Sequence, residues 1–305
     1  MKQILDLIGK TPLVRIRGNV FAKLEAVNPS GSIKDRMALY MLEKAEENSE
    51  IGPGYEIVEA TSGNTGISFA MIAAAKGYKF TAIMAETMSV ERRQIMRAYG
   101  ASFILTATME DAVKKLEEFA TKENVWLPKQ FSNQINVGCH RETTGKEILQ
   151  QLGEVGAFVA GVGTGGTLMG VAEALREKIP NVRIVAVEPS ECAVLSGGKA
   201  GVHKIQGIGS GFIPKIVDKS KIDKVIKVKS DDAVEMARKL ATQHGLFVGI
   251  SSGANVLASL EIARRMPNEN IVTILPDSAN RYLSTFLDEE FPGLSWKECQ
   301  GGRGA

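Results

Sequence analysis

The sequence is poor in the residues that metal centres and disulfide frameworks need, with three cysteines and three histidines in 305 residues. The cysteines are far apart, odd in number and form no Cys-x-x-Cys pair, so neither a disulfide framework nor a zinc ribbon is indicated. Cys139 precedes His140, but adjacent residues rarely chelate one ion, and the other two histidines are distant in sequence. We therefore expect no metal.

The chain also lacks an excess of one charge and a long apolar run. Its 37 basic and 35 acidic residues leave a net charge of +2, too small to indicate nucleic-acid binding. Residues 1–13 include Lys2, Asp6 and Lys10 and have no signal-peptide core, and the most apolar later stretch, 67–75, ends at a lysine. We expect a cytoplasmic protein with no membrane and no nucleic-acid partner.

Short apolar runs alternate with helix-like segments over most of the chain, a pattern typical of parallel strands covered by helices on both faces. The expected strands are 13–16, 20–24, 56–59, 80–85, 102–105, 158–161, 184–187, 225–228 and 271–275. The expected helices are one that starts at residue 33 and the segments 67–76, 90–99, 111–121, 168–177, 232–243 and 254–265. The pattern predicts two open, mostly parallel α/β layers with a cleft between them.

Residues 28–36, Asn-Pro-Ser-Gly-Ser-Ile-Lys-Asp-Arg, place a lysine where a cation is unfavourable. Ser32 followed by Asp35 is typical of a helix start, so Lys34 is expected in the first turn. The partly positive helix N-terminus favours a neutral amine, and a neutral lysine amine is a nucleophile. Schiff-base chemistry with a carbonyl cofactor is one interpretation, and an ordinary solvated lysine is the other.

The segment 157–168 runs from an apolar strand into a loop with four glycines and then into a helix. Its backbone N–H groups can approach an anion closely at the helix N-terminus, which predicts a phosphate site. A dinucleotide-binding fold competes, because Glu188 closes the next strand where a ribose-binding acid would stand. A glycine turn that serves tight packing alone is the third interpretation.

Two further polar turns follow strands. The turn at 60–66 carries more hydrogen-bonding side chains than a helix cap needs, which favours a carboxylate or phosphate ligand over an ordinary polar loop. These side chains are Thr61, Ser62, Asn64 and Thr65. The segment 275–282 lies at a strand's carboxyl end, where open α/β sheets bind ligands, although a plain helix cap also explains it.

Two other motif interpretations fail on the residues themselves. Residues 249–253 fit a nucleophile elbow, but no histidine follows residue 244, so the order that a hydrolase triad requires is missing. Gly9-Lys10-Thr11 resembles the end of a Walker A loop, but Ile4 stands where its first glycine should be.

Taken together, six motifs resemble the cysteine synthase (O-acetylserine sulfhydrylase) family of fold type II pyridoxal-phosphate enzymes. They lie in order over nearly the whole chain, at 28–36, 61–66, 163–167, 205–214, 249–253 and 276–284. This resemblance displaces the dinucleotide interpretation. It implies two α/β domains with the active site in the cleft between them, a homodimer, and serine acetyltransferase as a partner.

The same resemblance implies the domain limits and the site residues. We assign residues 36–143 to a smaller mobile domain and residues 1–35 with 144–305 to a larger cofactor-binding domain. Lys34 would hold pyridoxal 5'-phosphate as an internal aldimine, Asn64 would bond its phenolic oxygen, and Ser278 would face its pyridine nitrogen. The phosphate would be held by Gly163, Thr164, Gly165, Gly166 and Thr167. The substrate α-carboxylate would be held by Thr61, Ser62, Thr65 and Gln130.

A hydroxyl at Ser278 cannot keep the ring nitrogen protonated as an aspartate would, so the cofactor is a weaker electron sink. This favours α-proton removal with prompt loss of a β-substituent, leaving an α-aminoacrylate that a nucleophile attacks. The expected reaction is formation of L-cysteine from O-acetyl-L-serine and sulfide, with Lys34 as base and then acid.

The sequence departs from the commonest family pattern at residues 132–140 and at Ala279-Asn280. Both departures lie near the expected cleft, so other donors and acceptors stay open: cystathionine or lanthionine formation, or sulfide release from cysteine. A non-catalytic relative that binds an amino acid or a partner protein is a rival of another class. The presence of Lys34, Asn64, the glycine loop and Ser278 argues against it.

Overall fold

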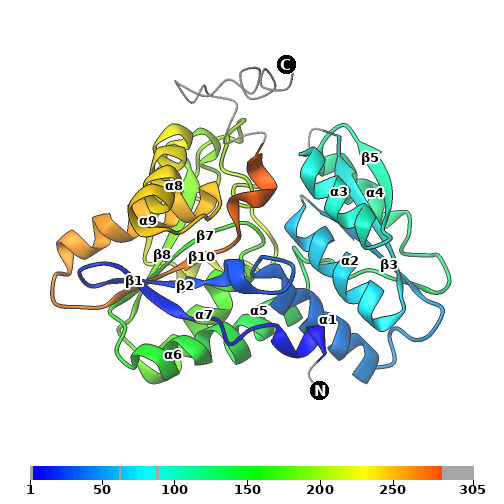
Figure 1. Cartoon of the computed structure of the whole chain (residues 1–305), viewed down its shortest axis with the longest axis horizontal. Helices are drawn as coiled ribbons and strands as arrows, with labels where there is room; N and C mark the ends of the chain where they lie inside the picture. The colour runs from blue at the N-terminus through cyan, green and yellow to red at the C-terminus, as the bar shows by residue number, and fades with distance from the viewer. Residues whose placement is uncertain (1–2, 62, 87–88, 284–305) are drawn as a thin grey trace, which may run out of the picture.

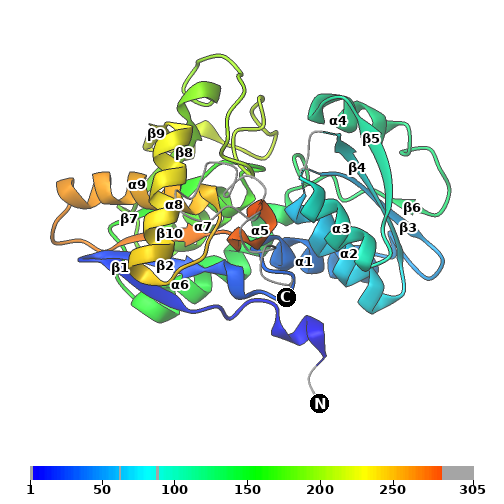
Figure 2. The same cartoon turned by 45° about the horizontal axis from the view of Figure 1, so that its top comes forward.

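The chain folds into two α/β units that lie side by side (Figures 1 and 2). The computed structural model describes residues 3–61, 63–86 and 89–283. One unit is built on a six-stranded sheet and the other on a four-stranded sheet, and all strand pairs are parallel except the first hairpin. The predicted fold class, two open and mostly parallel α/β layers, is confirmed.

The larger sheet has the order β1-β2-β10-β7-β8-β9, and the smaller sheet has the order β5-β4-β3-β6. The larger sheet is formed by β1 (Leu13–Arg17), β2 (Val20–Leu24), β7 (Ala157–Gly161), β8 (Arg183–Pro189), β9 (Lys224–Val228) and β10 (Ile271–Leu275). The smaller sheet is formed by β3 (Glu56–Ala60), β4 (Lys79–Ala85), β5 (Ser102–Thr106) and β6 (Val125–Trp126).

Helices cover both sheets. They are α1 (Lys34–Glu47), α2 (Asn64–Lys76), α3 (Val90–Ala98), α4 (Met109–Glu117), α5 (Ile135–His140), α6 (Lys146–Leu152), α7 (Gly166–Lys178), α8 (Ser230–His244) and α9 (Ile250–Arg265). A π-helical turn, η3 (Arg141–Gly145), joins α5 to α6, and 3-10 turns η2 (Glu25–Val27) and η6 (Ala279–Tyr282) follow β2 and β10. Figure 1 shows α2, α3 and α4 on the smaller unit, with α1 between the two units.

The buried apolar side chains form separate cores for the two units, and the chain crosses between them within a few residues. Ile33 packs in a core of the larger unit, whereas Met37, one helical turn later, packs in a core of the smaller unit. On α5, Val137 likewise packs in a core of the larger unit and Cys139 in a core of the smaller unit. The N-terminal end of α1 therefore lies at a boundary between the cores.

Most expected elements are present, but the segment 135–152 is helical although its sequence did not predict a helix. It contains Gly138, Gly145 and two threonines, Thr143 and Thr144, which lower intrinsic helix propensity. Tertiary packing on α7 overrides that propensity. A Cβ on Gly145 would lie 2.4 Å from the Ala174 Cβ, and one on Gly170 would lie 2.2 Å from the Val137 carbonyl oxygen, so glycine permits the close approach.

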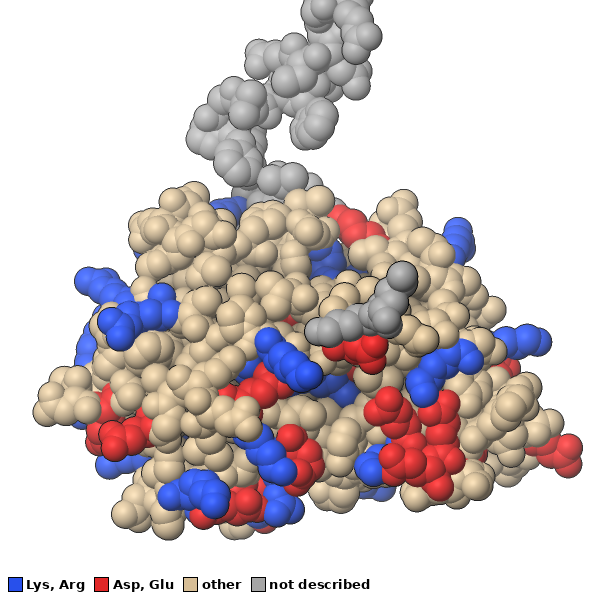
Figure 3. All heavy atoms as spheres, turned by 60° about the horizontal axis from the view of Figure 1, so that its bottom comes forward, with Lys and Arg blue, Asp and Glu red and all other residues tan. Residues whose placement is uncertain are grey.

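Charges of both signs are interspersed over the face of the molecule seen in Figure 3. Within residues 3–61, 63–86 and 89–283, no helix is both long and apolar enough to cross a membrane.

The α5–α7 contact gives a matched pair of substitutions. Gly170→Ala should destabilise the protein by about 1–3 kcal/mol, because the new methyl group meets backbone atoms of Val137 and Arg141 that cannot move aside independently. Gly138→Ala, on the facing helix, has no atom within 4 Å of its new Cβ and should be neutral or stabilising by up to about 1 kcal/mol. Urea unfolding measures both. Equal destabilisation by the two substitutions would contradict the close-approach explanation.

Candidate active site

A cavity of about 70 Å³ lies between the two units, and both contribute to its wall. The smaller unit contributes Asn64 and Thr65 from the start of α2, Arg92 from α3, and Gln130 and Phe131 from the loop after β6. The larger unit contributes the glycine loop between β7 and α7, and the N-terminal end of α1 adds Lys34. The cavity therefore collects residues from all six predicted motifs, at 28–36, 61–66, 163–167, 205–214, 249–253 and 276–284.

Lys34 is the first residue of α1, as predicted, and it is half-buried against the cavity. Its backbone N–H donates to the Ser32 hydroxyl at 3.3 Å, and its Nζ lies 3.5 Å from Thr164 Oγ1. Burial away from water lowers the pKa of Lys34 to about 8. The sequence attributed a lowered pKa to the helix N-terminus, whereas desolvation is its largest cause in the structure. The Lys34 amine is therefore neutral in a substantial fraction of molecules near pH 8.

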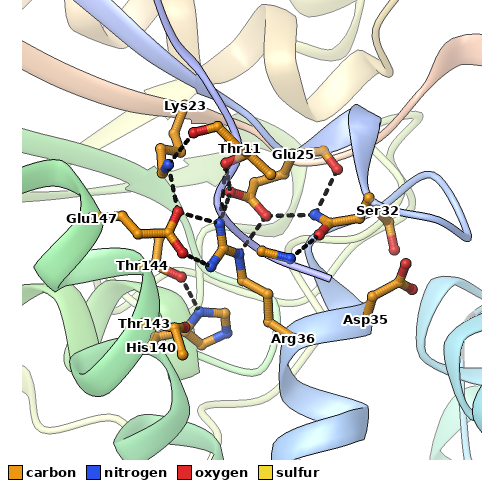
Figure 4. A network of polar contacts seen from close by, with 12 residues as sticks. Thr11, Lys23, Glu25, Ser32, Asp35, Arg36, His140, Thr143, Thr144 and Glu147 are labelled. Carbon is orange, nitrogen blue, oxygen red and sulfur yellow. Dashed lines mark hydrogen bonds and ion pairs between the residues drawn. The ribbon is translucent and has the colours of Figure 1, made fainter. Parts of the chain in front are cut away.

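The first turn of α1 is fixed by a buried ionic network (Figure 4). The Arg36 guanidinium makes paired hydrogen bonds to Glu25, at 2.7 and 2.9 Å, and to Glu147, at 2.6 and 2.8 Å. Lys23 Nζ lies 2.6 Å from the second Glu147 oxygen. Burial alone raises the pKa of Glu147, but the hydrogen bonds and charges of Arg36 and Lys23 hold it at about 2. The network ties α1 to β2, η2 and α6.

The glycine loop before α7 has the form of an anion cradle. Gly165 has φ of +90°, and a Cβ on Gly163 would lie 2.2 Å from the Gly207 carbonyl oxygen, so side chains are excluded there. Thr164 Oγ1 accepts a hydrogen bond from Asn136 Nδ2 at 3.1 Å, while Asn136 Oδ1 is buried without a partner. Gly163, Thr164, Gly165 and Thr167 line the cavity, at the positive end of a helix.

A buried histidine, drawn in Figure 4 beside Thr144, also contacts this cradle. His140 is fully buried, with Nδ1 2.9 Å from Thr144 Oγ1 and Nε2 3.3 Å from Thr167 Oγ1. Burial, and secondarily the charges of Lys34 and Arg36, lower the pKa of His140 well below its usual value. The imidazole is therefore neutral at physiological pH and hydrogen-bonds to threonine hydroxyls on two elements. Sequence reasoning had considered His140 only as a metal ligand.

The polar turn at 61–66 links β3 to α2. The Thr61 hydroxyl accepts hydrogen bonds from Gly63 N–H at 3.1 Å and Gly66 N–H at 2.9 Å, so it holds the turn together and does not line the cavity. Thr65 donates to Gln130 Oε1 at 2.7 Å, and both residues line the cavity. Ser62 lies outside the described residues.

Asn64 belongs to a polar cluster that sequence reasoning missed in part. Its Nδ2 donates to Asp277 Oδ2 at 2.6 Å, and its Oδ1 accepts from Arg281 at 2.7 Å. Tyr282 also donates to Asp277, whose Oδ1 is buried without a partner. Because an amide nitrogen has two N–H groups, one remains on Asn64 after the bond to Asp277.

Ser278 follows Asp277 at the carboxyl end of β10, where the sequence predicted a ligand-facing turn. Its hydroxyl accepts a hydrogen bond from Asn280 N–H at 3.3 Å, and its N–H donates to the Gly31 carbonyl oxygen at 3.2 Å. Ser278 does not line the cavity, whereas Pro276 of the same turn does. Its predicted contact with a pyridine nitrogen stays a prediction.

The residues of the cavity suit a cofactor that carries both a carbonyl group and a phosphate. Lys34 offers an amine with a lowered pKa, and the α7 N-terminus offers N–H groups in a cradle that a Cβ would fill. Among the described residues, no group of three or more potential metal ligands occurs. This combination defines an enzyme of the pyridoxal-phosphate class.

Comparison with known proteins agrees with that class. The model of the family described as "Pyridoxal-phosphate dependent enzyme" matches residues 4–277. The chain is 48% identical over 297 residues to a cysteine synthase of Staphylococcus aureus, covering 93% of this chain and 96% of that protein. The chain therefore belongs to the cysteine synthase family of pyridoxal-phosphate-dependent enzymes, as the six motifs predicted, and its cofactor is pyridoxal 5'-phosphate.

Two solved structures are similar over nearly their full length. O-ureido-L-serine synthase superposes with a TM-score of 0.92 at 42% identity, covering 98% of both chains. A hydrogen sulfide-producing enzyme from Fusobacterium nucleatum superposes with a TM-score of 0.88 at 44% identity, covering 93% of this chain and 100% of that chain. At these identities, the two proteins resemble this chain in sequence as well as in fold.

A buried carboxyl beside the site gives a pH-dependent prediction. Glu59 on β3 is fully buried; its Oε2 accepts from Gln130 N–H at 3.3 Å, and its Oε1 has no partner. Burial raises the pKa of Glu59 from 4.5 to about 8, so its neutral form is favoured in the folded protein. The unfolded chain then binds fewer protons between pH 4.5 and 8, and this carboxyl lowers stability progressively as pH rises through that window.

Glu59→Gln keeps an oxygen for the Gln130 N–H and removes the titration. It should leave stability nearly unchanged at pH 4.5 and raise the free energy of unfolding at pH 8 by on the order of a few kcal/mol. Urea unfolding of both proteins at pH 4.5, 6 and 8 measures the difference. A gain that is the same at all three values would contradict the raised pKa.

Proposed function

We propose that the protein is a pyridoxal-phosphate-dependent β-replacement enzyme that forms L-cysteine from O-acetyl-L-serine and sulfide. The observation that carries this proposal is that Lys34, half-buried and with a lowered pKa, shares one cavity with a phosphate cradle and a hydrogen-bonding turn. The 48% identity to a protein named cysteine synthase supports the choice of donor and nucleophile.

Lys34 Nζ is the catalytic base and acid. When bound, the cofactor supplies an electron sink for the bond that breaks at the amino acid's Cα. Lys34 Nζ takes the Cα proton in the donor half-reaction and returns a proton to Cα after sulfide has been added. A pKa near 8 suits both directions of transfer near neutral pH.

We propose that three groups of residues contact the cofactor. The cradle of Gly163, Thr164, Gly165, Gly166 and Thr167 holds the phosphate, with His140 orienting Thr167. The remaining N–H of Asn64 bonds the phenolic oxygen. Ser278 donates its O–H to the pyridine nitrogen, since a hydroxyl that accepts from Asn280 keeps its own proton free to donate.

The 61–66 turn binds the substrate α-carboxylate together with Gln130, through Thr65, the predicted Ser62 and the N–H groups that Thr61 arranges. Residues 36–143 form the smaller mobile domain, and residues 1–35 with 144–305 form the larger domain. Closing the smaller domain over the cavity excludes water from the active site while the reaction is between its two half-reactions. The change of core between Ile33 and Met37 supports the first limit, whereas near the second limit Val137 packs in the core of the larger unit and Cys139 in that of the smaller unit.

We further propose that the enzyme works in the cytoplasm as a homodimer. A complex with serine acetyltransferase is proposed from the family resemblance alone. Analytical ultracentrifugation of the purified protein, alone and with that partner, measures both associations.

The lysine assignment is tested by chemistry at one residue. Borohydride reduction should fix the cofactor covalently to Lys34, because this lysine combines burial in the cavity with a lowered pKa. Peptide mapping identifies the labelled residue. Lys34→Ala should abolish labelling and turnover, whereas Lys129→Ala, on an exposed pair with Glu117, should retain both. A label on any other lysine refutes the assignment.

The choice of substrates is tested by adding donors separately. With sulfide, O-acetylserine should give L-cysteine at a higher kcat/KM than serine, because acetate leaves more readily than hydroxide. Cysteine alone should release sulfide slowly. Faster sulfide release from cysteine than cysteine formation would assign the protein to sulfide production instead, the activity named for the similar Fusobacterium structure. No turnover of any donor would favour a non-catalytic binding role.

A further inference from the structure

Arg92 is a buried cation that neither the sequence motifs nor the proposed reaction uses. It belongs to α3 of the smaller unit and is 1% exposed. Its Nη1 donates to Gln206 Oε1 of the larger unit at 2.5 Å, across 114 residues of sequence. Its guanidinium also lies 4.7 Å from the centroid of the Tyr282 ring on η6, a cation–π contact. Arg92 therefore spans the two units, and it lines the cavity.

The Arg92 side chain also lies directly against the 61–66 turn. Gly63 has φ of +133°, and a Cβ there would lie 2.3 Å from Arg92 Cδ. One helical turn further along α3, Met96 Sδ lies 2.5 Å from the position of a Cβ on Gly66. The Thr61 hydroxyl bonds to the N–H groups of Gly63 and Gly66, while side chains of α3 pack against the same two glycines. A shift of Arg92 would thus free space beside the turn.

Arginine suits this position for a physical reason. Its planar guanidinium stays charged and offers hydrogen bonds in fixed directions while one face stacks on an aromatic ring. A hydrogen bond from a charged donor in a buried site is stronger than one between neutral groups. Lysine keeps the charge but loses the planar geometry, so the two residues are not equivalent here.

We propose that Arg92 is a positioning residue for the amino-acid substrate: anchored on Gln206 and Tyr282, it holds the 61–66 turn against the cavity. The inference rests on the proposed function in one respect, that this turn binds the substrate carboxylate. Arg92 acts through the turn and not on the reacting atoms. It should therefore affect donor binding more than chemistry or cofactor content.

The test compares four variants of the holoenzyme: Arg92→Met, Arg92→Lys, Gln206→Leu and Arg93→Met. Arg93 is the matched control, because it is the next residue on α3 and does not line the cavity. Three quantities are measured: KM and kcat for O-acetylserine with saturating sulfide, cofactor content by absorbance, and amide deuterium exchange of the peptide that contains residues 60–72. Exchange needs no turnover, so it reports on the turn independently of the reaction.

Arg92→Met should raise the donor KM about tenfold or more, as expected for the loss of a charged hydrogen bond, with a smaller change in kcat and unchanged cofactor content. Exchange in the 60–72 peptide should become faster. Arg92→Lys should give a partial effect and Gln206→Leu an effect in the same direction. Arg93→Met should behave as the parent.

Three results would overturn the proposal. The first is a parent-like donor KM and parent-like exchange in both Arg92→Met and Gln206→Leu. The second is faster exchange spread evenly over the smaller unit, which would make Arg92 a general structural cation. The third is loss of cofactor in proportion to activity. If Arg92→Met does not fold, Arg92→Lys and Gln206→Leu decide by the same measurements.

If the parent enzyme does not convert O-acetylserine, the proposed function fails, and the exchange measurement alone still decides the role of Arg92.

Discussion

The structure depends on the paired hydrogen bonds of Arg36 to Glu25 and Glu147, which are made almost out of contact with water. Removing one partner of such a network leaves an uncompensated buried charge, at a cost of about 3–5 kcal/mol. The network therefore permits only one orientation for the first turn of α1. Because Lys34 lies two residues before Arg36 in the same turn, the network also fixes the position of Lys34 in the wall of the cavity.

The same arrangement controls protonation around the site. Burial lowers the pKa of Lys34 to about 8, and the charges of Lys34 and Arg36 add to burial in keeping His140 neutral. A neutral imidazole can hydrogen-bond to both Thr144 and Thr167, whereas a charged one beside two cations would be repelled. One buried ionic network thus orients the lysine and helps to keep the histidine behind the phosphate cradle in its neutral form.

The features that the sequence predicted well are those that depend on residues close together in the chain. Lys34 in a first helical turn and the glycine loop before α7 follow from neighbouring residues, because helix-start signals and glycine runs act over a few positions. Arg92 was missed because its partner Gln206 lies 114 residues away, and no short motif marks such a pair. Asp277 was overlooked beside Ser278 in a turn that was recognised, since spacing alone does not tell which of two adjacent polar side chains enters the cluster around Asn64.

The division of the apolar cores explains why a cleft enzyme can place its lysine where α1 begins. Ile33 and Met37 pack in different cores, so Lys34 stands at the point where the chain passes from one unit to the other. The contacts across the cleft include the hydrogen bond from Arg92 to Gln206 and the aromatic pair Phe131 and Phe212, whose ring centroids are 5.1 Å apart. Such contacts can be broken and remade at lower cost than a continuous apolar core. In the proposed closure, the smaller unit carries the 61–66 turn toward the cavity that Lys34 lines.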